Sequence, residues 1–306
     1  MASGIVDIDE VYDSAGGMIL VTDPVADIIL DFHLAEHIDE EVVTAFLQSL
    51  CGGGLPVRGA STDRSNLYSG GKLAGVWEGV VHQHCVFHLL QESNRDLLRA
   101  VAAVRKTIKK LRARRRGRPC KRGRPRTQRF DKRTFVHQHR FLFTRRPDHL
   151  SDDDRQLLAT MTEIAPDLAV IRRFTDQLHQ LLSPQQTPVA ARELRDRMMA
   201  TPDYHAHPHL VRILRRLLGN KLEPFIAYLS LPGLERTTNH VERKNRRFRL
   251  LQKTRYKRRK ISSIANAMKL ELMHQKSRWQ RAHPPGCHAS EPPSGTNPDV
   301  PCSIAA

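Results

Sequence analysis

Three acidic side chains stand out in a basic chain because their types and surroundings suit metal-dependent chemistry. Asp9 lies among β-branched residues, Asp63 directly follows a predicted strand, and Glu242 opens a helix rich in arginine. Carboxylate oxygens are the ligands that hard divalent cations prefer, and a pair of such ions can activate a hydroxyl and stabilise a leaving oxygen. Clustered carboxylates repel one another unless a cation shares them. The three acids therefore predict a phosphoryl-transfer centre.

Each acid also has an ordinary structural explanation. An aspartate after a strand is often a turn residue, and Asn239 with Glu242 has the spacing of a helix capping box. Asp7 and Asp9 would point to the same face of one strand, so alternation cannot choose between them. Spacing alone leaves these alternatives open.

The elements that would position these acids follow from the pattern of apolar residues and turns. Short strands are predicted at residues 5–12, 18–22 and 28–34, followed by a helix at 40–50 that a run of three glycines ends. The pattern then predicts a strand at 57–62, a short helix at 73–77 and a strand at 80–86. This order is typical of a ribonuclease-H-like α/β fold with a mixed sheet.

After residue 88 the sequence becomes almost entirely helical. Leu97, Val101, Val104, Ile108 and Leu111 form one amphipathic stripe, which predicts a helix that continues into the basic run 112–126. Further helices are predicted at residues 153–164, 167–182, 189–199, 209–218 and 260–274. The last ~25 residues are rich in Pro, Gly and Ser, and their composition indicates disorder.

Composition narrows the class of protein. The 306 residues carry 50 Lys and Arg against 32 Asp and Glu, a formal charge of +18. Such a surplus favours a polyanionic partner, most often nucleic acid. No apolar run is long enough to span a bilayer, and the acidic start lacks the basic region of a signal peptide. Five scattered cysteines fit a reducing cytosol rather than a disulfide framework.

Two basic segments predict contacts with DNA. The tetrapeptide Arg-Gly-Arg-Pro occurs twice, at 116–119 and 122–125, and looks like the AT-hook motif, which lies in the minor groove of A·T-rich DNA. The alternative is a solvated loop that contacts phosphates without sequence preference. The predicted DNA contacts there are Arg116, Arg118, Arg122 and Arg124.

The second segment, 243–260, contains 11 Lys and Arg and no acid. Val241, Phe248 and Leu251 would face the core, which leaves the basic residues free. We expect a phosphate-contacting wall beside Glu242, formed by Arg243, Lys244, Arg246, Arg247 and Arg249.

Four motifs in order resemble the catalytic domain of DDE-type insertion-sequence transposases. They are Ile8-Asp-Glu-Val-Tyr, Ser61-Thr-Asp-Arg-Ser-Asn, His82-Gln-His-Cys-Val-Phe-His-Leu-Leu-Gln and Thr238-Asn-His-Val-Glu-Arg-Lys-Asn-Arg-Arg-Phe-Arg. The resemblance covers residues 4–276. It implies that Asp9, Asp63 and Glu242 form a catalytic triad that holds two Mg²⁺ ions, for which Mn²⁺ can substitute. It favours Asp9 over Asp7 because the Asp-Glu dipeptide of the family falls there.

The resemblance also assigns a supporting role to Cys85 and His88, with Asn239. A lone Cys-x-x-His is a weak zinc signal, since a structural zinc site needs four ligands. On an extended strand Cys85 and His88 would face opposite sides, so they can converge only if a helix begins near Cys85. In several transposase groups such a motif follows the second aspartate and braces the active site, which is the role we expect here.

The same resemblance implies the division of the chain and its setting. Residues 1–90 would form the first part of the ribonuclease-H-like core, 91–230 a basic, all-helical insertion, 231–278 the part of the core with the glutamate helix, and 279–306 a disordered tail. Expected partners are double-stranded DNA, as transposon ends and target, and further copies of this chain in a homo-oligomer on DNA. No membrane partner is expected. The expected location is the bacterial cytoplasm, associated with the nucleoid.

One departure from the family supports a rival hypothesis. Such enzymes usually carry an amino-terminal DNA-recognition module, which is missing before Asp9. The rival is a truncated, catalytically inactive transposase-derived DNA-binding protein. A nuclease of the same fold, which cuts without joining, is a third alternative.

Overall fold

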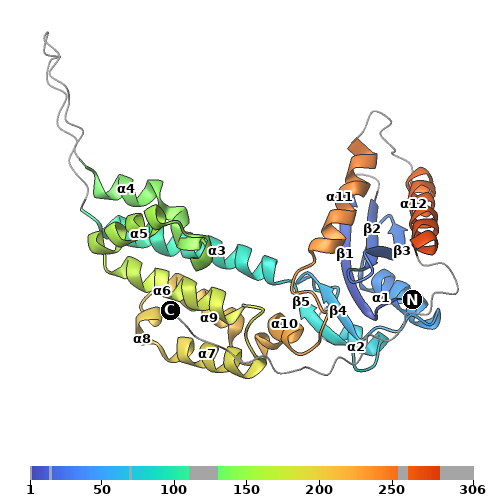
Figure 1. The fold of residues 1–306 in the computed structure, drawn as a ribbon, viewed down its shortest axis with the longest axis horizontal. Helices are drawn as coiled ribbons and strands as arrows, with labels where there is room; N and C mark the ends of the chain where they lie inside the picture. Colours follow the sequence, from blue (N-terminus) through green and yellow to red (C-terminus); the bar gives the residue numbers. More distant parts are fainter. Residues whose placement is uncertain (1, 14–15, 69–70, 110–129, 254–260, 283–306) are drawn as a thin grey trace, which may run out of the picture.

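The computed structural model describes residues 2–13, 16–68, 71–109, 130–253 and 261–282. Its helices and strands form two lobes (Figure 1). The sheet lobe comprises the described residues between 2 and 85 and between 230 and 282, and the helical lobe comprises the described residues between 86 and 229. The predicted basic insertion segment 110–129 and the tail from residue 283 lie outside the described residues.

The sheet lobe is built on one mixed sheet of five strands. These are β1 (Ile5–Asp13), β2 (Gly16–Asp23), β3 (Ile28–Ala35), β4 (Gly59–Thr62) and β5 (Val81–His84). The strand order is β3-β2-β1-β4-β5, with β1, β2 and β3 antiparallel and β1, β4 and β5 parallel. This is the predicted ribonuclease-H-like arrangement, in which three hairpin strands are followed by two crossovers.

Helices cover both faces of the sheet. α1 (Glu40–Gly52) and α2 (Lys72–Val76) pack on the face that carries Val6 and Ile8. α11 (Asn239–Lys253) and α12 (Ile261–Ala282) lie on the opposite face, where Val11 packs with apolar residues of both helices. Because side chains alternate along β1, Asp7 and Asp9 share the α11 face with Val11.

The helical lobe has its own apolar core and is connected to the sheet lobe directly. Its first helix, α3 (Val86–Thr107), starts two residues after β5 ends. Leu97, Val101 and Val104 of the predicted stripe are buried in its core. The remaining helices are α4 (Lys132–Gln138), α5 (Asp152–Ile164), α6 (Asp167–Leu181), α7 (Pro188–Ala200), α8 (Pro202–His205), α9 (Pro208–Leu217) and α10 (Glu223–Ile226). In the described part of this lobe, short 3₁₀ helices join them at Arg140–Thr144, Pro147–His149, Gly219–Lys221 and Ala227–Leu229.

Two helix ends differ from the sequence-based expectation. α3 stops at Thr107 because Ile108 adopts extended backbone angles, so the predicted continuation through Ile108 into the basic run is wrong. Val104 is buried in the core of the helical lobe and Ile108 still packs against that core, so the helix ends although its apolar contacts continue. α12 runs to Ala282, past the predicted end at His274. Among the described helices, none is long and apolar enough to cross a membrane.

Candidate active site

Asp9 and Asp63 meet because β4 ends beside the middle of its parallel neighbour β1. β1 and β4 pair in parallel with Ile8 opposite Thr62, so Asp63 leaves β4 next to Asp9. Asp63 then turns back, and its Oδ1 accepts the Ser65 amide at 2.7 Å. Asp63 is thus the turn residue that the sequence allowed, and it also lies beside Asp9.

The described residues contain one acidic group with metal-ligand spacing at this point. Asp9, Glu10 and Asp63 each offer a carboxylate oxygen, and these oxygens all lie within 4.8 Å of one another. All three side chains are partly exposed, so solvent and a ligand can reach them. A donor set made only of carboxylate oxygens suits Mg²⁺ or Mn²⁺ and is a poor match for soft metals.

The pKa values show the electrostatic cost of this cluster without a cation. Burial and the neighbouring charge of Asp63 raise the pKa of Asp9 to about 6, although a hydrogen bond from Asn245 opposes the rise. Burial and the charges of Asp63 and Asp9 raise the pKa of Glu10 to about 7. A divalent cation would offset this repulsion, so the residues present fit the ion that the sequence predicts.

Glu242 approaches the same place from α11. It is partly exposed, and its charge contributes to the raised pKa of Asp9. Glu242 is outside the group of mutually close oxygens, where Glu10 stands instead. The Thr238 hydroxyl donates to Glu242 Oε1 at 3.4 Å, and the Glu242 amide donates to the Thr238 carbonyl at 3.0 Å. Asn239 is the first residue of α11 and its side chain is exposed.

Asn245 is a site residue that the sequence analysis missed. It lies one turn after Glu242, is 3 % exposed, and donates from Nδ2 to Asp9 Oδ2 at 2.7 Å. Its Oδ1 is buried and has no hydrogen-bond partner among the described residues. The offset of three residues from Glu242 is the signal that could have revealed it, because residues three apart share a helix face. Glu10 was likewise missed as a candidate ligand.

Asp7 has a different environment from Asp9. It is fully buried, and neither carboxylate oxygen has a hydrogen-bond partner among the described residues. Burial and the nearby Glu235 raise the pKa of Asp7 to about 8, although the neighbouring Ser61 opposes the rise. Asp7 is absent from the group of close oxygens, in which Asp9 is present.

Cys85 and His88 converge as the helix hypothesis requires, since α3 begins at Val86. Their contact raises the pKa of His88 to about 9. Burial raises the pKa of the Cys85 thiol, but contacts with His88 and Thr238 outweigh burial and lower it overall. Cys85 Sγ accepts the Thr238 amide at 3.4 Å, which connects the start of α3 to the residue before α11.

The structure describes four of the five side chains of the predicted basic wall, and three of these are exposed. Arg243, Arg246 and Arg249 are exposed, and a cavity of about 620 Å³ next to Glu242 is lined by Arg236, Arg243 and Arg246. The side chain of Lys244 instead forms an ion pair with Asp27, with Nζ 3.0 Å from Oδ1. The side chain of Arg247 lies outside the described residues, as do Arg116, Arg118, Arg122 and Arg124.

The raised pKa values predict how a cation binds. Asp9 and Glu10 must lose protons to act as ligands, so metal binding competes with protons below about pH 7. We expect the affinity for Mn²⁺, measured by isothermal titration calorimetry, to fall by roughly one to two orders of magnitude from pH 8 to pH 5.5. Protons should be released on binding near pH 6. An affinity that does not change over this range would contradict the site.

Comparison with known proteins gives one result that covers most of the chain. Residues 8–261 match a family model described as a transposase, of the DDE type named ISL3. The matched range includes Asp9, Asp63 and Glu242. No curated protein matches the sequence.

Proposed function

The chain belongs to the ISL3 family of DDE transposases, and we propose from this premise that its acidic cluster cleaves and joins DNA strands. Asp9 and Asp63 would hold divalent ions, Mg²⁺ or Mn²⁺, with Glu242 as the third catalytic carboxylate. The single observation that best supports this proposal is the meeting of Asp9, Glu10 and Asp63 oxygens within 4.8 Å beside the helix that carries Glu242.

The proposed reaction has two successive phosphoryl transfers. In the first, water attacks a phosphodiester at the transposon end and the bond to the 3′ oxygen breaks, which leaves a 3′-hydroxyl. In the second, that hydroxyl attacks a phosphodiester of target DNA, whose own 3′ oxygen leaves. Each step exchanges one P–O bond for another, so no external energy source is required.

Each residue has a definite task in this proposal. When bound, divalent ions would supply Lewis-acid chemistry that favours attack of the hydroxyl and departure of the leaving oxygen. Asp9 and Asp63 would hold the ions, and Asn245 donates to one oxygen of Asp9, which would leave the other oxygen for an ion. The carboxylates act as ligands only, so no covalent enzyme intermediate forms.

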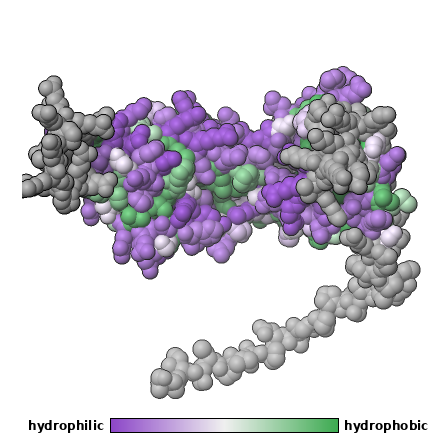
Figure 2. Space-filling model, turned by 90° about the horizontal axis from the view of Figure 1, so that it is seen from above, coloured by the Kyte–Doolittle hydropathy of each residue, from purple (hydrophilic) through white to green (hydrophobic). Residues whose placement is uncertain are grey.

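The surface suits a DNA partner. Hydrophilic residues cover most of the described surface on the face shown in Figure 2. Arg243 and Arg246 line the cavity next to Glu242. Among the described residues neither forms an ion pair. Free guanidinium groups can neutralise the phosphates that flank the reacting one.

The experiment is a strand-transfer assay with DNA that carries the pre-cleaved ends of the encoding element, in the presence of Mg²⁺ or Mn²⁺. The proposal expects joined product that disappears with EDTA. Cleavage without joining would favour a nuclease of the same fold. DNA binding without any chemistry would favour the transposase-derived binding protein. In that case, neutralising the acids would leave DNA affinity unchanged.

A further inference from the structure

The segment that returns from the helical lobe to α11 is attached to a row of buried polar residues on the sheet. Thr22, Asp7, Ser61 and Gln83 lie side by side across β2, β1, β4 and β5, and all four are fully buried. Three of them contact the returning segment: Gln83 Oε1 accepts the Tyr228 amide at 2.9 Å, Ser61 donates to the Glu235 carbonyl at 2.8 Å, and Thr22 bonds His240. The path of the chain into α11 is therefore set by the sheet.

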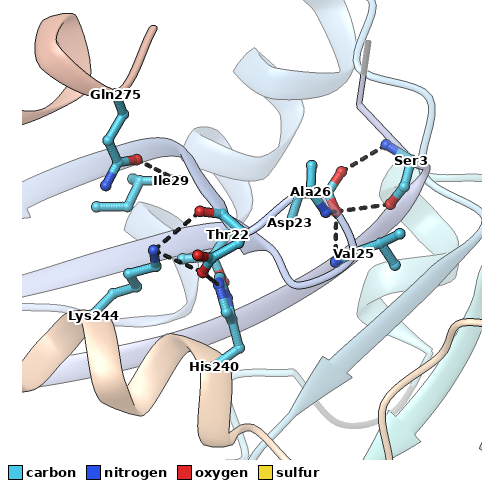
Figure 3. A network of polar contacts seen from close by, with 10 residues as sticks. Ser3, Thr22, Asp23, Val25, Ala26, Ile29, His240, Lys244 and Gln275 are labelled. Atoms are coloured by element: carbon cyan, nitrogen blue, oxygen red, sulfur yellow. Dashed lines mark hydrogen bonds and ion pairs between the residues drawn. The ribbon is translucent and has the colours of Figure 1, made fainter. Parts of the chain in front are cut away.

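His240 makes the last of these contacts, in the first turn of α11. Its imidazole is 1 % exposed, with Nδ1 2.9 Å from the Thr22 hydroxyl and Nε2 2.8 Å from Asp27 Oδ1. One turn later, Lys244 Nζ lies 3.0 Å from Asp27 Oδ1 and donates to the Asp27 carbonyl at 3.1 Å. Figure 3 shows His240 and Lys244 extending from α11 toward Thr22. His240 and Lys244 therefore both bind Asp27.

Asp27 belongs to a well-defined turn between β2 and β3. It has a positive φ of 52°, in the left-handed region. Asp23 fixes the other end of the turn, since its Oδ1 accepts the amides of Val25 at 3.0 Å and Ala26 at 2.9 Å. The Ser3 hydroxyl donates to the same oxygen at 2.9 Å (Figure 3). The turn therefore offers α11 a fixed point of attachment on the sheet.

The rotation of α11 decides which side chains reach Asp9. His240 and Lys244 are four residues apart and share one helix face, and Val241 and Asn245, also four apart, share the neighbouring buried face. Holding the first pair at Asp27 and Thr22 leaves Asn245 pointing at Asp9 and Glu242 beside it. Rotation of α11 about its axis by one residue position would move both Asn245 and Glu242 away from Asp9.

We propose that His240, held by Thr22 and Asp27, is a positioning residue that fixes the rotation of α11 and so places Glu242 and Asn245 against Asp9. Lys244 supports it through Asp27. This inference rests on the proposed function for its catalytic consequence, while the attachment of α11 can be measured without catalysis.

The test variant is Asp27→Gly. Glycine adopts a φ of 52° without strain, so this change removes the carboxylate and leaves the turn intact. Asp27→Asn is the conservative variant, because asparagine tolerates the same backbone and keeps one carbonyl acceptor for His240. Glu40→Gln is the matched control, since it removes a 2.7 Å ion pair with Lys72 on the α1–α2 side of the sheet.

Hydrogen exchange and joining kinetics are measured on the same proteins. We expect Asp27→Gly to speed amide exchange in residues 239–246 and to lower the joining rate at saturating DNA about tenfold, with DNA affinity changed less than about twofold. Asp27→Asn should restore most of the rate, and Glu40→Gln should match the wild type. Lys244→Met should lower the joining rate to the same extent as Asp27→Gly and should leave the affinity for DNA unchanged.

Two results would overturn the inference: unchanged exchange in α11 of Asp27→Gly, or faster exchange with a wild-type joining rate. If the wild-type protein joins no DNA under any condition, the proposed function fails instead. The exchange measurement then still decides whether Asp27 and His240 hold α11 in place.

Discussion

Replacing Asp63 by asparagine is expected to abolish strand joining. Asparagine keeps the shape of the side chain and can still accept the Ser65 amide, so the turn after β4 should form. It loses the negative charge that would bind a divalent ion between β1 and β4. We expect the joining rate to fall roughly a thousandfold or more, as is usual when a ligand of a catalytic metal is lost. The measurement is product formation in the strand-transfer assay.

Asp9→Asn and Glu242→Gln should lower the joining rate by the same factor, although Asp9 lies on a strand and Glu242 on a helix. DNA affinity should stay the same or rise, because removing a negative charge weakens repulsion of phosphate. Glu10→Gln distinguishes Glu10 from Glu242 as the third ligand. We expect the joining rate of Glu10→Gln to fall only about tenfold, mainly because Mn²⁺ binds more weakly. Glu41→Gln, on the exposed side of α1, is the control. Joining by Asp63→Asn at the wild-type rate would refute the catalytic assignment.

For the candidate carboxylate on β1, the local sequence pattern narrows the choice only to the pair Asp7 and Asp9. Alternation places Asp7 and Asp9 on one face of β1, and nothing local separates them. The difference comes from register: β4 ends at Thr62 opposite Ile8, so Asp63 lies beside Asp9 and Asp7 is enclosed between β2 and β4. Register depends on packing of whole strands, which a local pattern does not encode.

Other parts of the site depend on contacts between residues far apart in the sequence. His240 and Thr22 are separated by 218 positions, so no spacing rule connects them. The contact between Cys85 and His88, by contrast, follows from helix geometry once α3 starts at Val86, and could be predicted. The strand order could also be predicted, because short connections leave few possible arrangements of hairpins and crossovers.

The second large effect is expected on the pH dependence of the free energy of unfolding, when Asp7 is replaced. Because Asp7 is fully buried and lies near the charge of Glu235, its pKa rises to about 8 in the folded protein, although Ser61 opposes the rise. In the unfolded chain the carboxyl loses its proton near pH 4. Between pH 4 and pH 8 the folded state therefore binds one proton more than the unfolded state at this position. The stability that Asp7 contributes is complete below pH 4 and is lost as the pH rises to 8.

Asp7→Asn removes this titration while preserving the shape of the side chain. Relative to the wild type, we expect the free energy of unfolding of Asp7→Asn to rise by up to about 1.4 kcal/mol per pH unit between pH 5 and pH 8. The slope is the decisive quantity, because a constant offset from the buried amide cancels in it. Urea unfolding at several pH values, with EDTA present, measures it. An equal pH dependence in the two proteins would show that Asp7 is charged in the folded state, and Asp7 would then become a candidate ligand beside Asp9.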